Sequence, residues 1–314
     1  MKIFFTSIGR RVELVQAFRE AADRVGKELE IYGGDIVSTA PALSFCDHAI
    51  KLPSIMDAAY ISTLIKICRD EKIDALIPTI DTDLLVLAKN KGSFGKTRVV
   101  VSEVDKVAIS RDKRLTAIYF NSLGLKSPHP VDNYLKYSGG FPAFIKPRDG
   151  SSSISAYRVD SAKELYSYAK QIPGYIIQPY VDGTEYTVDI FCDFEGNPIY
   201  ITPRIRLAVR EGEVLKTQIS QDAKIIEELK VLIYDFRPCG SITVQLIRES
   251  LTQEDYFIEI NPRFGGGAPL GMKAGADSAG ALLRLLVGER LSFVDGAAED
   301  GAVFSRFDQS VRVR

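Results

Sequence analysis

Short apolar runs alternate with amphipathic helical patterns along the first hundred residues, and this alternation constrains the fold more than any other feature of the sequence. Residues 2–7, 29–35 and 75–79 have the length and apolar character of buried strands, whereas residues 12–25 and 57–70 place apolar side chains at helical spacing. Parallel strands need a long crossover connection, which is usually a helix. The alternation therefore predicts a parallel sheet with helices on both faces.

The pattern changes in the second half of the chain. Two long alternating runs, residues 185–192 and 199–209, are joined by a Glu-Gly-Asn turn at 195–197, which predicts a β-hairpin. Residues 242–248 and 256–260 are expected to add two strands to the same antiparallel sheet. The predicted fold class is therefore α/β, with an N-terminal parallel α/β domain followed by α+β subdomains that contain antiparallel sheets.

A segment rich in proline and glycine, residues 128–142, separates the two patterns. Such residues punctuate chains between regular elements. We expect three parts along the chain: an N-terminal domain over 1–104, a small subdomain over 105–180 and a C-terminal α+β subdomain over 181–314.

The composition is typical of a soluble globular chain, because 46% of the 314 residues are hydrophobic and 26% are charged. The 40 Lys and Arg residues against 41 Asp and Glu leave a net charge of −1, whereas nucleic-acid-binding domains normally carry a basic excess. The charge therefore gives no support for nucleic acid or an anionic membrane as a partner. No apolar run reaches the ~18 residues of a membrane span, and we expect a cytoplasmic protein.

Cysteine and histidine usage limits the chemistry further. The four cysteines form no CxxC pair, which favours reduced, buried thiols. Only two histidines are present, which argues against a multi-histidine zinc or iron site. A metal in this chain is therefore expected to have oxygen ligands.

Three oxygen-bearing side chains lie on two predicted strands late in the chain. Glu259 and Asn261 are two residues apart in FIEINPRFGGG, so they share one face of a strand. Gln245, in the strand ITVQLI, can point the same way. A carboxylate with two amide oxygens suits Mg²⁺ or Mn²⁺, which binds few protein carboxylates and completes its shell with water and phosphate. A surface strand that ends in a polar turn is the alternative.

Two lysines and a loop of small residues indicate a phosphate site. Lys146 ends the predicted strand PAFIKP, and the loop DGSSSIS that follows contains Ser151, Ser152 and Ser153, whose hydroxyls and backbone amides can close on a phosphate. Lys113 begins a predicted helix, where a phosphate would also meet the helix N-terminus. The alternatives are solvated lysines and a mobile hairpin tip.

The segment YIIQPYVDGTEYTVDIF predicts a strand, a turn and a second strand. A flat base can lie against Tyr180 and Val181 while backbone groups bind its edge, and Glu185 can accept hydrogen bonds from ribose hydroxyls. A strand-turn-strand without a ligand is the alternative.

Taken in order, these elements resemble the ATP-grasp superfamily, in particular the branch that contains biotin carboxylase and the large subunit of carbamoyl phosphate synthase. The resemblance covers residues 109–286 by motif and the first hundred residues by pattern. It implies that ATP and magnesium (or manganese) are the cofactors. The implied nucleotide-binding residues are Lys113, Lys146, Ser151, Ser152, Ser153, Gln178, Tyr180, Val181 and Glu185, and the implied metal ligands are Gln245, Glu259 and Asn261.

Two departures from the family pattern affect the nucleotide site. The phosphate loop is serine-rich where many relatives are glycine-rich, and Gln178 stands where a glutamate is common. The resemblance also places Arg263 beside the transferred phosphate. Arg206 and Arg210, at the end of a predicted strand, are candidates to hold a substrate carboxylate, with a charged strand end as the alternative. Arg10 or Arg11 is a further candidate for substrate contact.

The resemblance implies an ATP-dependent, ADP-forming ligase. A carboxylate would take the γ-phosphate to form an acyl phosphate, and an amine or another nucleophile would then displace phosphate. Lys146, Arg263 and Arg206 are the expected catalytic residues. The implied partners are small-molecule carboxylates and amines, and the resemblance is compatible with a homodimer.

Three other functions stay open at this point. A carbamoyl-phosphate-synthase-like enzyme or subunit that phosphorylates bicarbonate or carbamate would share every nucleotide-binding residue. A dinucleotide-dependent oxidoreductase would need a glycine fingerprint, and GxGxxG does not follow the first predicted strand. The third is a non-catalytic nucleotide-binding module, against which the presence of Lys146, Glu259 and Arg263 argues.

Overall fold

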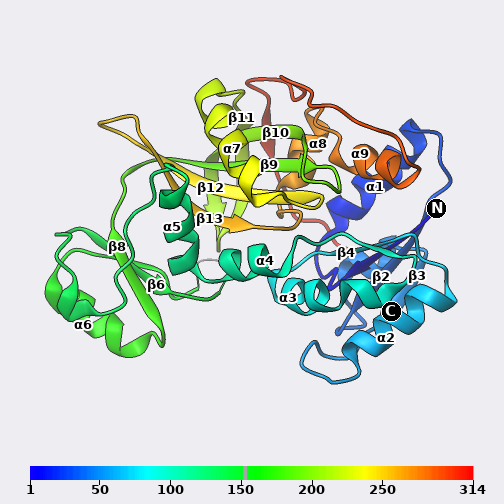
Figure 1. The fold of residues 1–314 in the computed structure, drawn as a ribbon, viewed down its shortest axis with the longest axis horizontal. Coiled ribbons are helices and arrows are strands. Elements are labelled where there is room, and N and C mark those ends of the chain that lie inside the picture. Colours follow the sequence, from blue (N-terminus) through cyan, green and yellow to red (C-terminus); the bar gives the residue numbers. More distant parts are fainter. Residues whose placement is uncertain (151–153, 314) are drawn as a thin grey trace.

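The computed structural model describes residues 1–150 and 154–313, and it contains three sheets arranged along one axis (Figure 1). A parallel five-stranded sheet lies at one end, a small three-stranded sheet at the other, and a long six-stranded antiparallel sheet between them. This confirms the predicted mixture of a parallel N-terminal sheet with antiparallel sheets after it. The boundaries at 104/105 and 180/181 stay a prediction.

The parallel sheet has the strand order β3-β2-β1-β4-β5. Its side chains alternate between two helical layers, because successive residues of a strand point to opposite faces. Ile3 and Phe5 pack on the side of α1, whereas Phe4 packs with α2 and α3. The elements are β1 (Lys2–Thr6), α1 (Val12–Arg24), β2 (Glu30–Asp35), β3 (His48–Lys51), α2 (Tyr60–Asp70), β4 (Ala75–Pro78), α3 (Asp81–Asn90), β5 (Arg98–Val99) and α4 (Val104–Arg111), with 3₁₀ helices at Pro41–Phe45 and Lys91–Phe94.

The small sheet has the order β7-β6-β8, and α6 covers one of its faces. Ala143 and Ile145 point into this α6 core, so Phe144 and Lys146 point to the opposite face. The elements here are α5 (Lys113–Ser122), a 3₁₀ helix at Tyr134–Lys136, β6 (Ala143–Pro147), β7 (Tyr157–Val159), α6 (Ala162–Gln171) and β8 (Tyr175–Pro179).

The long sheet has the order β13-β12-β9-β10-β11-β14, and β9 with β10 form the predicted hairpin. Helix α7 covers its apolar face, where Val188 and Ile190 of β9 pack with Ile242 and Val244 of β12. The elements are β9 (Gly183–Cys192), β10 (Pro198–Arg210), β11 (Glu213–Ile219), α7 (Ala223–Phe236), β12 (Ser241–Glu249), β13 (Asp255–Asn261), α8 (Ala268–Lys273), α9 (Ser278–Leu286) and β14 (Val303–Ser305).

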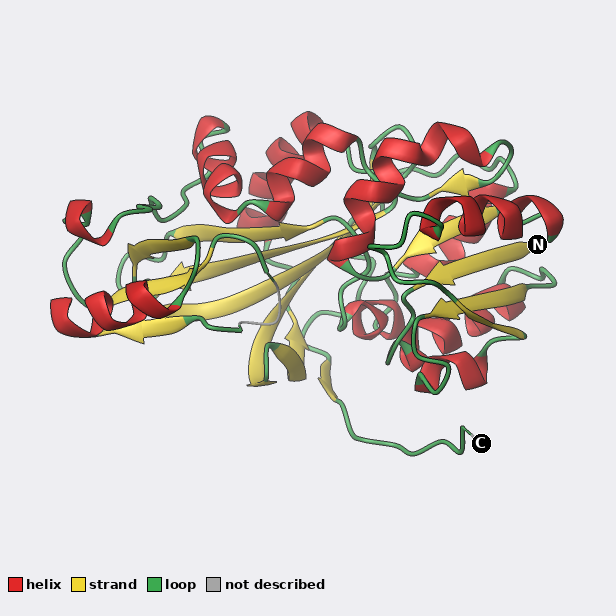
Figure 2. Cartoon of the chain, turned by 90° about the horizontal axis from the view of Figure 1, so that it is seen from below, coloured by secondary structure: helices red, strands yellow, loops and turns green. Residues whose placement is uncertain are grey.

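The N-terminal sheet shares a core with the C-terminal helices. Phe18 of α1 contacts Phe264 edge-on at 5.8 Å between ring centroids, and Phe264 stacks on Phe191 at 6.2 Å. Helices α8 and α9 pack against α1 of the N-terminal part. Figure 2 shows the chain running from its last short strand to the C-terminus as an extended loop. Within the described ranges, no helix is long and apolar enough to cross a membrane.

Candidate functional site

A cavity of about 230 Å³ lies between the small sheet and the polar face of the long sheet. Strand alternation directs one set of side chains into it from each sheet, because the other set is used by the α6 and α7 cores. Most of the predicted site residues line it: Lys113, Lys146, Gln178, Tyr180, Val181, Glu185, Arg206, Gln245 and Glu259. Ser151, Ser152 and Ser153 lie outside the described residues.

Lys146 is the buried cation of this cavity. It is 6% exposed and its ammonium lies 5.8 Å from the centre of the Phe144 ring. Burial lowers the pKa of Lys146 to about 8, against the opposing attraction of Glu259 and with a smaller lowering from Lys113. A lysine in this state gains a favourable partner when an anion enters the cavity.

Lys113 reaches the same cavity from the first residue of α5. The Asp112 carboxylate caps that helix by accepting hydrogen bonds from the amides of Arg114 and Leu115. The Lys113 ammonium donates to the carbonyl of Gly150, at the start of the predicted phosphate loop. Lys113 thus links the start of α5 to Gly150 in the predicted phosphate loop.

The segment predicted to contact the adenine base, which we call the hinge, comprises Gln178 to Val181 at the end of β8 and just after it. Gln178 is buried, and its amide donates to the carbonyl of Pro128 at 2.6 Å, so its nitrogen is committed to the protein. Tyr180 and Val181 line the cavity, and the Arg158 guanidinium lies 4.9 Å from the centre of the Tyr180 ring. The departure from glutamate at Gln178 therefore has a structural explanation, because an amide can donate to that carbonyl and a carboxylate cannot.

Arg206 pairs with the predicted ribose carboxylate. Its Nε lies 3.2 Å from an oxygen of Glu185, and its terminal nitrogens donate to the Thr187 hydroxyl at 3.2 Å and the Gly212 carbonyl at 3.1 Å. Burial lowers the pKa of Arg206, while Glu185 raises it. Arg206 is thus held in the wall of the cavity, whereas Arg210 is exposed and pairs with Asp308 at 3.3 Å.

The three predicted metal ligands lie on two adjacent strands, Gln245 in the middle of β12 and Glu259 and Asn261 at the C-terminal end of β13. Gln245 lies directly opposite Glu259 in the antiparallel register, and the Asn261 amide donates to the Glu259 carboxylate at 3.0 Å. Within residues 1–150 and 154–313, no three His, Cys, Asp or Glu side chains gather to hold a metal ion. One carboxylate with two amide oxygens fits Mg²⁺ that is shared with phosphate groups.

Arg263 follows the predicted metal ligands in the sequence, and its side chain contacts the N-terminal part of the chain. Its Nη2 donates to the Asp81 carboxylate at 2.8 Å and to the Asn261 side-chain oxygen at 3.3 Å. Arg11, at the end of the loop after β1, lies near Arg263 and Glu213, and burial lowers the pKa of Arg11. Arg10 is exposed.

A second cavity adjoins the first. The two share Lys113, Gly150 and Glu259, so these residues stand where the cavities meet. The rest of the second cavity comes from α3, from α4, from the loop after β6 and from the end of β13: Asp81, Thr82, Leu84, Val107, Ser110, Arg111, Asp149, Asn261 and Pro262. A group transferred from a molecule in one cavity to a molecule in the other would pass Lys113 and Glu259.

A buried ion pair in the same sheet as the predicted metal ligands is not indicated by any motif of the sequence. Arg204 is 1% exposed, and its Nε and Nη2 donate to the Asp189 carboxylate at 2.6 and 3.3 Å. Arg204 supports the glycine-rich turn after Arg263, because a Cβ on Gly267 would lie 2.7 Å from Arg204 Nη2. Alternation of polar residues on both strands of the hairpin is the signal that points to this face.

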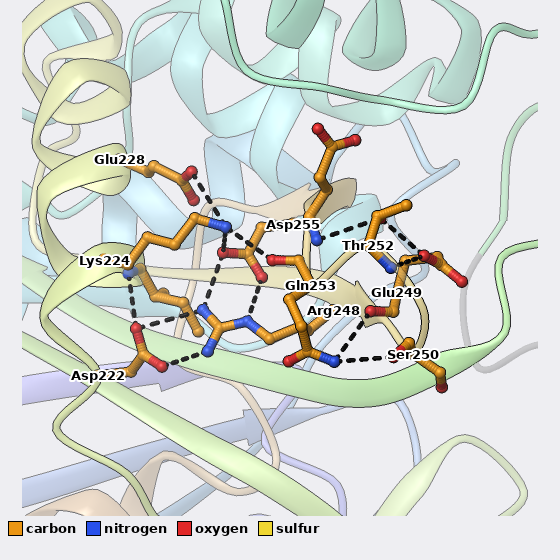
Figure 3. Close-up of polar contacts among 11 residues, drawn as sticks. Asp222, Lys224, Glu228, Arg248, Glu249, Ser250, Thr252, Gln253 and Asp255 are labelled. Atoms are coloured by element: carbon orange, nitrogen blue, oxygen red, sulfur yellow. Dashed lines mark hydrogen bonds and ion pairs between the residues drawn. The ribbon is translucent and has the colours of Figure 1, made fainter.

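A charged cluster outside the cavity fixes the β12–β13 hairpin to α7 (Figure 3). Asp255 is buried and pairs with Arg248 at 2.8 Å and with Lys224 at 2.9 Å. Arg248 also pairs with Asp222, which caps α7. The cluster is structural, because its cations are paired within it.

The chain matches two family models. Residues 3–102 match the PylC-like N-terminal domain, and residues 110–267, half of the chain, match the ATP-grasp domain. The curated relatives include a 3-methyl-D-ornithine–L-lysine ligase of Methanosarcina mazei, 28% identical over 39% of this chain and 31% of that protein. They also include a D-alanine–D-alanine ligase of Francisella tularensis, 24% identical over 57% of this chain and 65% of that protein. The chain thus spans less than a third of the length of the first relative and about two thirds of the second.

Solved structures share the fold over almost the whole chain. The biotin carboxylase domain of Hydrogenobacter thermophilus 2-oxoglutarate carboxylase, solved with MgADP and bicarbonate, has a TM-score of 0.73 at 17% identity over 96% of this chain and 73% of that chain. An L-amino acid ligase from Bacillus licheniformis has a TM-score of 0.70 at 17% identity over 91% of this chain and 74% of that chain. The ATP-grasp fold that the motifs predict is confirmed, its solved neighbours include biotin carboxylases, and the chain belongs to the ATP-grasp family.

Proposed function

We propose that this chain is an ATP- and Mg²⁺-dependent carboxylate–amine ligase. The substrate carboxylate attacks the γ-phosphorus of ATP, which forms an acyl phosphate and releases ADP. An amine then attacks the acyl carbon, loses a proton and displaces phosphate. The observation that carries this proposal is the convergence of Lys113, Lys146 and Glu259 on one cavity that adjoins a second cavity.

The chain's own residues serve mainly to position charge, as in other phosphoryl transfers. Lys146 and Lys113 bind the phosphates, and Glu185 with the hinge residues Tyr180 and Val181 binds the nucleoside. Held by Glu259 with Gln245 and Asn261, Mg²⁺ would neutralise charge on the phosphate oxygens.

Two arginines complete the proposed machinery. Arg263 holds the acyl phosphate, because its planar fork matches two oxygens. Arg206 adds a further cation to the wall of the nucleotide cavity, where Glu185 holds it in place. The buried environment of both side chains strengthens their attraction for phosphate oxygens.

The substrates are proposed to be amino acids. The names of the curated relatives, an L-lysine ligase and D-alanine–D-alanine ligases, describe the joining of amino acids. An amino acid supplies either the carboxylate that is phosphorylated or the amine that attacks.

The first test is thermal unfolding with and without Mg-ATP, followed by ADP release with pairs drawn from the twenty L-amino acids and D-alanine. A ligand at a hundred times its Kd adds ~2.7 kcal/mol to the free energy of unfolding. Glu259→Ala should abolish the Mg-ATP shift. Glu254→Ala, in the same hairpin but outside the cavity, should keep it. Absence of any shift at millimolar Mg-ATP would contradict the proposal, and ADP release with bicarbonate and ammonia alone would favour the carbamoyl-phosphate-type reaction.

A further inference from the structure

The ion pair between Asp81 and Arg263 joins the N-terminal part to the proposed phosphoryl-transfer site. Arg263 Nη2 donates to Asp81 Oδ2 at 2.8 Å, and the Arg263 side chain is only 12% exposed. Asp81 also lines the second cavity, together with Asn261 and Glu259. A residue 182 positions away in the chain thus contacts the arginine proposed to hold the acyl phosphate.

Asp81 stands on a firmly anchored element. It occupies the first turn of α3, where the partial positive charge of a helix N-terminus favours a carboxylate. Asp83, two residues later, is fully buried and accepts hydrogen bonds from the hydroxyls of Thr6 and Ser7 at 2.8 and 2.7 Å. The start of α3 is therefore tied to the end of β1, and the Asp81 carboxylate projects from a fixed place.

The Arg263 guanidinium is held by one of its nitrogens. Nη2 binds both Asp81 and Asn261, whereas Nη1 makes only a 3.5 Å contact with the Phe264 carbonyl. The buried Nε has no hydrogen-bond partner in the parts of the chain that the structure describes. The protein therefore fixes the group through Nη2 and leaves bonding capacity on the other nitrogens.

Asp81 also balances the charge around Arg263. The Arg11 guanidinium lies close enough to Arg263 to be repelled by it, Glu213 and Asp81 attract Arg11, and Asp81 pairs with Arg263. Two neighbouring guanidiniums in a largely buried place cost free energy unless carboxylates compensate their charge, and Asp81 is the carboxylate paired with Arg263. Without the Asp81 carboxylate, Arg263 would be expected to swing away from Arg11 and out of line with the metal ligands.

We propose that Asp81 is a positioning residue for the transfer step: its carboxylate holds Arg263 in the orientation that receives the transferred phosphate. This inference rests on the proposed function, because it takes the role of Arg263 from there. In the competing arrangement, the Asp81 carboxylate occupies the place of a substrate anion on Arg263 and leaves when that anion binds. The two arrangements predict different effects of Asp81→Asn: the positioning role predicts a lower kcat, whereas the competing arrangement predicts a lower KM for the amino acid.

The test compares Asp81→Asn, Asp81→Glu and the control Lys273→Ala, which breaks the ion pair between Lys273 and Glu13 (3.4 Å) elsewhere on the same interface. With the amino-acid pair that gives the highest ADP release, Asp81→Asn should lower kcat 10- to 100-fold with the KM for ATP unchanged, as expected for a misplaced group. Asp81→Glu should recover part of the loss, and Lys273→Ala should stay within twofold of the wild type. A lower KM for the amino acid with kcat unchanged would overturn the proposal in favour of the competing arrangement.

A second readout does not depend on turnover. Phenylglyoxal modifies accessible guanidiniums, and peptide mapping by mass spectrometry follows Arg263 individually. Asp81→Asn should raise the modification rate of Arg263 severalfold, whereas Lys273→Ala should not change it. An unchanged rate in Asp81→Asn would overturn the positioning role even if the chain proves to be a ligase. If no amino-acid pair releases ADP from the wild type, the proposed function fails, while the modification rate still decides whether Asp81 holds Arg263.

Discussion

Gln245 lies directly opposite Glu259 in the pairing of β12 with β13, and the same row continues through Thr187 of β9 to Arg204 of β10. A row that crosses four strands places its side chains on one face of the sheet. The proposed metal ligands are therefore part of a rigid polar face, and a change at Gln245 should alter the metal site without altering the apolar core beneath α7.

Gln245→Leu should raise the Mg²⁺ concentration needed for half-maximal stabilisation by ATP about tenfold, which corresponds to ~1.4 kcal/mol. The substitution removes one oxygen donor and leaves the Glu259 carboxylate in place. Thermal unfolding at fixed ATP with increasing Mg²⁺ measures the midpoint. An unchanged midpoint would show that Gln245 is not a metal ligand, and Thr252→Val, at the tip of the same hairpin, serves as the control.

Lys146 should make ATP binding depend on pH above neutrality. Burial lowers the pKa of Lys146 to about 8 in the free protein, and only the charged ammonium binds phosphate well. The affinity for Mg-ATP should therefore fall as the pH rises through 8, approaching tenfold per unit. Isothermal titration from pH 7 to 10 measures this dependence. Lys146→Arg, which stays charged, should abolish it, and the same pH dependence in that variant would assign it to another group.

Gly267→Ala should destabilise the protein by ~1–3 kcal/mol, the usual effect of overpacking. The new methyl group would lie 2.7 Å from Arg204 Nη2 and 2.9 Å from Val214 Cγ1, and Arg204 cannot move without weakening its pair with Asp189. Urea denaturation measures the loss. Gly92→Ala is the control, because a Cβ there meets nothing within 4 Å, and it should change stability by less than ~1 kcal/mol. Equal stabilities of the wild type and Gly267→Ala would mean that the turn at Gly267 can shift to accommodate the methyl group.

The parallel sheet was predictable because β1, β2 and β4 are buried on both faces, so their apolar runs are continuous and the intervening helices are strongly amphipathic. By contrast, β14 has only three residues, Val303–Ser305, and it is a strand because β11 pairs with it. A local pattern cannot indicate such a strand, since its conformation depends on a partner about ninety residues away.

In the candidate site, too, some relationships between residues can be predicted from the sequence and others depend on the folded structure. Glu259 and Asn261 share a strand, so their spacing alone predicts a common face. Arg204 and Asp189 belong to different strands, and their burial depends on the register of the β9–β10 hairpin and on the turn at Gly267. Asp81 meets Arg263 only through packing between the N-terminal sheet and the rest of the chain. The sequence therefore indicates residues that share a face of one strand, but it does not indicate contacts that depend on packing between distant parts of the chain.

Glu228 should make the stability depend on pH through the cluster in Figure 3. Burial and the nearby Asp255 carboxylate raise the pKa of Glu228 from 4.5 to about 7, while Lys224, 3.9 Å away, opposes the shift. Between pH 4.5 and 7 the folded state binds more protons at this site than the unfolded state. The contribution of Glu228 to the free energy of unfolding is therefore largest below pH 4.5 and declines as the pH rises through 7.

Glu228→Gln removes this titration. The variant should gain stability relative to the wild type as the pH rises from 5 to 8, because the wild-type carboxyl must then ionise beside Asp255. Urea denaturation at pH 5, 6, 7 and 8 measures the difference at each pH. Glu227→Gln is the matched control, since that carboxylate is 69% exposed and pairs with Lys230 at 2.6 Å, and its difference from the wild type should not grow with pH. Parallel stability curves for wild type and Glu228→Gln would show that the cluster does not hold a proton near neutral pH.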